Sequence, residues 1–153
     1  YSSFTPLKNK LEIFLNSSKN NIREARLLSV MKYDEIQKVI NSFVHEGPFL
    51  AAVVASEDGL PVASSVKTGL DQQLAAALAG LVHQTIDRIR NELDLGDVKY
   101  ILVYSKKGTL VFRSVPIDKE SNMIFVALIP RGVRYFKRKI SQVVRDIKRV
   151  FKQ

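Results

Sequence analysis

The stretch AVVASEDGLPVAS, residues 52–64, decides the fold, because it holds two strands and the turn between them. Apolar residues run almost without interruption over 49–55, which is typical of a buried strand. Asp58 and Gly59 follow, a pair that readily supplies the positive φ angles of a tight hairpin turn. The chain then returns as a second strand over residues 60–65. Pro61 has no amide hydrogen for a sheet ladder, so we expect it at a strand start or a sheet edge.

Helix and strand patterns extend on both sides of this hairpin. Before it, Ile36, Val39, Ile40 and Phe43 recur at helical spacing, and Pro48 marks the end of that helix. After it, a long helix begins at residues 68–71 and ends near residue 96. Three further strands and a final amphipathic helix are predicted over residues 98–105, 109–115, 123–129 and 133–151.

The predicted strands are apolar on both faces, and such strands are usually covered on both sides of their sheet. The fold class is therefore α/β: a three-layer α/β/α sandwich with a five-stranded, largely antiparallel sheet and the order α-β-β-α-β-β-β-α. We assign residues 31–153 to this domain. Residues 1–30 form an N-terminal extension, partly helical or flexible, in which the polar run at 16–21 predicts a loop.

Length and composition indicate one domain in a reducing compartment. The 153 residues are 46% hydrophobic, enough for one packed core. No apolar run approaches the roughly 18–20 residues that span a bilayer, and no stretch has the pattern of a signal peptide. The absence of cysteine excludes disulfides and thiolate metal sites. We expect a cytoplasmic protein.

The net charge of +9 is concentrated in the last helix. Residues 131–153 contain nine of the 24 Lys and Arg residues but only one of the 15 acidic residues, Asp146. Such a basic segment fits either a solvated surface or a phosphate-rich partner, namely an anionic membrane or a nucleic acid. The basic positions expected to point away from the apolar stripe form a basic surface: Arg134, Lys137, Arg138, Arg145, Lys148 and Arg149.

The middle helix is more apolar than one buried face requires. Its large residues Leu74, Leu78 and Leu81 share one side with Thr85 and Ile89, and this side is expected to pack on the sheet. A second row of mostly small residues lies beside it: Ala75, Ala76, Ala79, Gly80, Val82, His83 and Ile86. Because small residues allow two backbones to approach closely, we expect this row to contact the same helix of a second copy. Cover by another helix of the same chain is the alternative.

A search for catalytic motifs finds none. Lys107 and Gly108 belong to a hairpin turn and lack the upstream glycine of a phosphate-binding loop. No nucleophile elbow is present. His45 and His83 lie on separate helices without carboxylates at metal-ligand spacing, so we assign no catalytic residue, metal or cofactor. The sequence therefore favours an interaction module over an enzyme.

The hairpin segment EDGLPVAS, residues 57–64, followed by the Ala- and Leu-rich helix LAAALAGL at 74–81, resembles the Roadblock (dynein light-chain) family. The strand YILVY at 100–104 and the helix exit at 93–96 fit the same resemblance, which covers about residues 33–151. The motif is specific over residues 58–64 and generic elsewhere. The extension at 1–30 lies outside the resemblance.

The resemblance implies function as well as fold. Members of this family form homodimers in which the middle helices pair and the third strands join the two sheets. In this chain Lys99, Ile101 and Val103 would lie at that strand junction. Members bind small Ras-like GTPases as activating proteins or scaffolds, without a catalytic residue of their own. The expected GTPase contacts are polar positions beside the dimer seam: Gln72, Gln73, Asp87 and Arg90, with Ala76 and His83 between them.

Two other functions remain open from the residues alone. A ligand-sensing domain of similar build would need a polar pocket in its core, and the strands offer almost no inward polar residue. An adaptor that docks on an anionic membrane or a nucleic acid would use the basic surface of the last helix.

Overall fold

The computed structural model describes the backbone of residues 4–152 and the side chains of residues 21–152. The chain divides after Asp34 into two compact units. Helix α1 (Phe4–His45) provides the first unit and contributes its last turns to the second. No helix among the described residues has the length and apolarity needed to cross a bilayer.

The loop predicted at residues 16–21 is wrong, because the backbone is helical throughout that range. The sequence contains no Gly or Pro between Pro6 and Gly47, so nothing interrupts helix propagation there. The side chains of residues 1–20 lie outside the described ones.

The second unit contains a five-stranded sheet that is antiparallel at every ladder. Its strands are β1 (Ala51–Ser56), β2 (Pro61–Val66), β3 (Tyr100–Ser105), β4 (Gly108–Pro116) and β5 (Asn122–Ile129). Their order across the sheet is β2-β1-β5-β4-β3, so β2 and β3 form the two edges. Pro61 is the first residue of an edge strand, as its missing amide hydrogen predicted.

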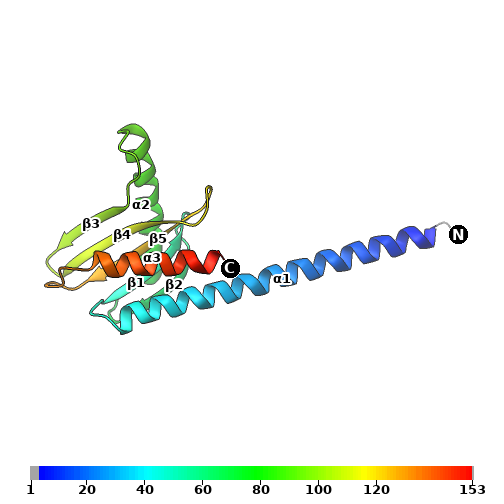
Figure 1. Ribbon diagram of the computed structural model, residues 1–153, viewed down its shortest axis with the longest axis horizontal. Coiled ribbons are helices and arrows are strands. Elements are labelled where there is room, and N and C mark those ends of the chain that lie inside the picture. Colours follow the sequence, from blue (N-terminus) through cyan, green and yellow to red (C-terminus); the bar gives the residue numbers. More distant parts are fainter. Residues whose placement is uncertain (1–3, 153) are drawn as a thin grey trace. The chain divides into compact units, whose positions relative to one another are not determined.

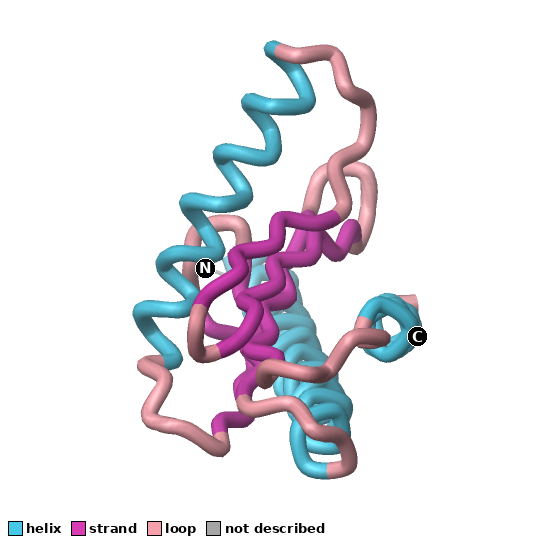
Figure 2. The backbone as a smooth tube through the Cα atoms, turned by 90° about the vertical axis from the view of Figure 1, so that its left-hand side faces the viewer, coloured by secondary structure: helices cyan, strands magenta, loops and turns pink. Residues whose placement is uncertain are grey.

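Helices cover both faces of this sheet, which confirms the three-layer architecture. Helix α2 (Gln72–Glu92) packs on one face, while the end of α1 and α3 (Lys137–Phe151) pack on the other (Figures 1 and 2). Strand β1 is apolar on both sides because Val53 and Ala55 face α2, whereas Ala52 and Val54 face α1 and α3.

Aromatic and branched side chains form the core beneath α1 and α3. Phe43 of α1 stacks on Phe49 with ring centroids 4.1 Å apart, and it forms a T-shaped pair with Phe125 of β5, with ring centroids 5.2 Å apart. The apolar stripe of α3 is buried at Ile140, Val143, Val144, Ile147 and Val150. Burial of each such side chain contributes about 1.5–3 kcal/mol, so α3 is anchored by one face and presents the other to solvent.

Candidate functional site

Helix α2 begins at a cap that its sequence encodes. The Asp71 carboxylate accepts hydrogen bonds from the backbone N–H groups of Gln73 and Leu74, at 3.0 and 3.1 Å. These bonds satisfy two donors that have no partner inside the helix. The cap therefore sets where α2 starts and which of its faces meets the sheet.

The expectation for the two faces of α2 is wrong. The small residues assigned to a contact between copies are buried against the chain's own sheet: Ala75, Ala76, Ala79, Gly80, His83 and Ile86. Val82 is half-buried beside them. The three leucines expected on the sheet are exposed instead, with Leu74 at 58%, Leu78 at 43% and Leu81 at 59%.

Close packing explains the reversal. A Cβ placed on Gly80 would lie 3.0 Å from both the Cα and N atoms of Gly59, in the turn between β1 and β2. Gly59 itself has a φ of 82° and approaches the Ala77 backbone. Small residues on α2 are thus used to bring the helix onto its own hairpin, so they cannot form a surface for a second chain.

The exposed residues Leu74, Leu78 and Leu81, here called the leucine face, border an uncovered part of the sheet. Helix α2 packs mainly on β1, β5 and β2 and leaves the β3–β4 side of this sheet face open. Leu74 and Leu78 line a small apolar hollow of about 70 Å³ together with Leu110 and Phe112 of β4. The leucine face of α2 and the exposed β3–β4 part of the sheet, here called the β3–β4 floor, therefore form one continuous apolar surface.

The predicted strand-junction residues lie along the edge of that floor. Ile101 pairs with Phe112 and Val103 with Leu110, so both are on the α2 side of the sheet. Val103 and Lys99 are exposed, and Ile101 is half-buried. Among the described strands β3 pairs only with β4, which leaves its outer edge free to pair.

The four polar positions predicted to contact a GTPase fall at the two ends of α2. Gln72 and Gln73 are exposed in the first turn, and the Gln72 Oε1 atom accepts a hydrogen bond from Ser64 Oγ at 2.6 Å. Near the other end, Arg90 lies 3.9 Å from Asp87 and 3.8 Å from Asp97. The side chains of Arg90 and Asp87 are both a little under half exposed, so both remain accessible to a partner.

His83 is buried and joins α2 to the first hairpin. Its Nε2 atom lies 3.4 Å from an Asp87 oxygen and 4.0 Å from a Glu57 oxygen. Glu57 in turn accepts a hydrogen bond from the Asn122 backbone N–H. Within residues 21–152 no cluster of His, Asp and Glu could hold a metal ion. The link to Glu57 spans distant parts of the chain, and no local pattern in the sequence indicates it.

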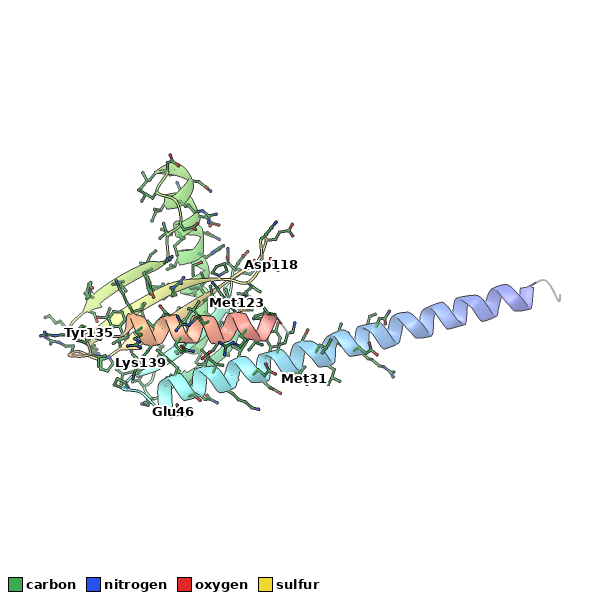
Figure 3. All side chains as sticks on the ribbon, in the orientation of Figure 1. Met31, Glu46, Asp118, Met123, Tyr135 and Lys139 are labelled. Carbon is green, nitrogen blue, oxygen red and sulfur yellow. The ribbon has the colours of Figure 1, made fainter. Side chains whose placement is uncertain are left out.

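Most of the basic surface lies on the opposite side of the domain, along and just before α3, but Lys148 lines a hollow that also contains Asp87 and Arg90 of α2. Arg134, Lys137, Arg138, Arg145 and Arg149 are exposed, and Lys148 is half-buried. Figure 3 shows Tyr135 and Lys139 at the N-terminal end of the same helix. The sheet therefore separates a largely apolar surface around α2 from a strongly basic one on α3.

Comparison with known proteins places this fold in a family. The Roadblock/LC7 domain model matches residues 36–116, which covers β1 to β4 with α2 between them, so the chain belongs to the Roadblock/LC7 domain family. This agrees with the resemblance drawn from the hairpin and the helix that follows it. No curated protein sequence matches the chain.

Several solved structures share the fold. MglB of Myxococcus xanthus superposes with a TM-score of 0.69 at 11% identity, over 78% of this chain and 90% of that one. The gliding protein MglB of Thermus thermophilus gives 0.61 at 12%, over 79% and 91%. A Roadblock/LC7 domain of Streptomyces avermitilis gives 0.50 at 21%, over 76% and 91%. At these identities the likeness concerns the fold alone.

Proposed function

We propose that this chain is a homodimeric, non-enzymatic module that binds and regulates a small Ras-like GTPase, by stimulating its hydrolysis or by acting as a scaffold. Membership of the Roadblock/LC7 family supports the class of partner. The leucine face beside the open β3–β4 floor is the observation that carries the proposal, because it is an apolar surface with nothing of the described chain on it.

A second copy of the chain fits this surface. A two-fold axis would bring each α2 against the partner's α2 and onto the partner's exposed β3–β4 strands. The same surface of both copies would then form the contact. The free edges of β3 would meet in the same arrangement. The contact therefore uses Leu74, Leu78, Leu81, Ile101 and Val103, and replaces the small residues expected from the sequence.

The GTPase contact is proposed on the α2 layer beside this seam. Once the leucine face is covered, the polar positions Gln72, Gln73, Asp87 and Arg90 flank the paired helices. Arg90 is the best single candidate for a large contribution, because arginine is enriched at the energetic centres of interfaces and keeps its charge.

Titration calorimetry with the host's Ras-like GTPases, loaded with GDP or with a GTP analogue, tests this proposal. We expect binding in one nucleotide state with two chains per GTPase. Arg90→Ala should weaken the affinity about tenfold or more, as loss of an interface hot spot does. Arg145→Ala removes the same side chain from the opposite sheet face and is the matched control, with no expected effect. The proposal is wrong if no GTPase binds in either state.

A second partner is proposed for the basic surface, since its charge lies on the sheet face turned away from α2. An anionic partner fits such a surface, and a cytoplasmic location would expose it to both anionic lipid and nucleic acid. The two surfaces would let the chain act as an adaptor with one partner on each side.

A further inference from the structure

The outward side of α3 carries a row of arginines. Its buried stripe runs from Ile140 to Val150. At 100° per residue, Arg138, Arg145 and Arg149 project on the side opposite that stripe, and all three are exposed. Over this spacing the row extends about 16 Å along the helix axis. We call these three residues the arginine row.

The charge of this row is mostly uncompensated. Asp146 is the single acid of α3, and its carboxylate lies 3.7 Å from Arg149. Arg145 donates a hydrogen bond of 2.7 Å to the neutral amide of Gln142, and within residues 21–152 neither Arg138 nor Arg145 has an ion pair. Like charges so placed repel one another, so an anionic partner would stabilise this side of the helix.

Exposed aromatic rings extend the row at the start of α3. Tyr135 is 91% exposed and Tyr104 of β3 is 75% exposed. Both line a shallow hollow of about 520 Å³ whose other walls come from Leu102, Phe136 and three cations, Arg134, Lys137 and Arg138. No acidic residue lines this hollow. Tyrosine beside arginine and lysine is the composition found where proteins meet the headgroup layer of a bilayer.

The geometry of this layer favours a flat target. The end of α1 and α3 lie side by side on the sheet (Figure 1). A groove of about 470 Å³ lies between them, and its lining includes Phe43 and Val143. Because α3 lies beside the end of α1 on the same sheet face, its exposed side is part of a two-helix layer and does not stand out as a single projecting helix. A row of exposed arginines on a two-helix layer instead presents its charges to a plane.

We propose that the arginine row, together with Tyr104, Tyr135 and the cations between them, docks the domain on an anionic lipid bilayer. The arginines would meet the phosphate and carboxylate groups of the lipid surface. The two tyrosine rings would lie at headgroup depth. The proposal goes beyond GTPase regulation and stands without it, because it uses the sheet face opposite α2.

Cosedimentation of the full chain with vesicles tests this proposal. One set is phosphatidylcholine alone, and the other contains roughly a third phosphatidylserine. We expect binding to the phosphatidylserine vesicles only, with affinity that falls steeply as salt is raised. Removal of one cation near such a surface weakens binding about fivefold, so Arg145→Glu should lose at least that factor. The separate variant Tyr135→Ser should also bind the vesicles more weakly than the parent chain, without a change in the salt dependence.

Arg88→Glu is the matched control. Arg88 is an exposed α2 residue paired with Glu92 at 3.2 Å, so the same change of charge is made on the other sheet face. We expect its vesicle affinity to stay within twofold of the parent. Circular dichroism of each variant confirms that the fold is intact. The GTPase titration with the parent chain tests the α2 surface separately, so failure of one proposal can be told from failure of the other.

Five outcomes would overturn the proposal, and the first four concern the binding assays themselves. They are no binding to phosphatidylserine vesicles at low salt, equal binding to phosphatidylcholine, an equal loss with Arg88→Glu, and tighter binding to a single-stranded or duplex oligonucleotide than to vesicles. The fourth outcome would assign the basic surface to nucleic acid. Competition by free inorganic phosphate at millimolar concentration would likewise show that a soluble anion, not the bilayer, is the ligand.

Discussion

At the scale of single residues, Gly80 decides how α2 meets its sheet. Gly80→Val would place side-chain carbons against the Gly59 backbone, where even a Cβ has only 3.0 Å. Backbone atoms of a turn cannot move as a flexible side chain can, so we expect the free energy of unfolding to fall by about 1–3 kcal/mol. Urea unfolding followed by circular dichroism measures it. Gln84→Val, at an exposed position of the same helix, controls for the introduction of a β-branched residue into α2 and should change stability by less than about 0.5 kcal/mol.

Asp118 provides a pH-dependent contact in the loop between β4 and β5. The side chain of Asp118 lies in this loop (Figure 3). Its carboxylate accepts hydrogen bonds from the backbone N–H groups of Glu120 and Ser121, at 2.8 and 2.7 Å, and these hold its pKa below the usual value. Because the folded pKa is depressed, the stabilisation is complete above the unfolded pKa and is lost as pH falls through the folded one. An NMR titration of the Asp118 carboxyl carbon should show a midpoint below that of the urea-unfolded chain. Equal midpoints would contradict these bonds.

At the scale of elements, the leucine face of α2 allows the contact between copies to be tested without disturbing the core of one chain. Leu78→Arg places a charge in the centre of the proposed contact between copies and leaves the chain's own core intact, because Leu78 is 43% exposed. We expect a folded monomer by light scattering, where the parent shows twice the chain mass. Leu60→Arg changes a leucine in the first hairpin that is more exposed, at 64%, and should leave the dimer unchanged.

The reversed faces of α2 also change how the contact between copies is tested. Ala79 is fully buried against the sheet, so an arginine there would disrupt the core of one chain before any contact between chains was affected. A parent chain that remains monomeric at tens of micromolar, a range in which an interface of standard size normally associates, would refute the proposed dimer.

At the scale of the whole molecule, the division after Asp34 predicts that the second unit folds by itself. The apolar core of the described residues begins at Ile36, and residues 21–31 are exposed. Removal of residues 1–30 should therefore leave the urea midpoint of the remaining domain unchanged. A shift of the midpoint by more than the experimental error would show that the first part of α1 contributes to the stability of that domain. The full chain measured in parallel is the control.

The sequence by itself determined the architecture. The hairpin at 52–64 is local chemistry, because Asp58 and Gly59 specify the turn and the apolar runs specify the strands. The covered sheet follows from strands that are apolar on both sides. The sequence of α3 also determines which of its sides is exposed. Its charged and apolar residues separate at helical spacing, so only the apolar stripe can pack on the sheet.

Only the tertiary structure decided which side of α2 meets the sheet. Two apolar rows share that helix, and hydrophobicity alone favours burial of the larger leucines. The choice instead depends on how closely the Gly59 turn approaches Gly80, a contact between residues far apart in the chain. The distance from His83 to Glu57 has the same origin. Local periodicity identifies apolar faces, whereas close approach between distant backbones selects among them, and that is why the surface left for a partner became visible only in the folded chain.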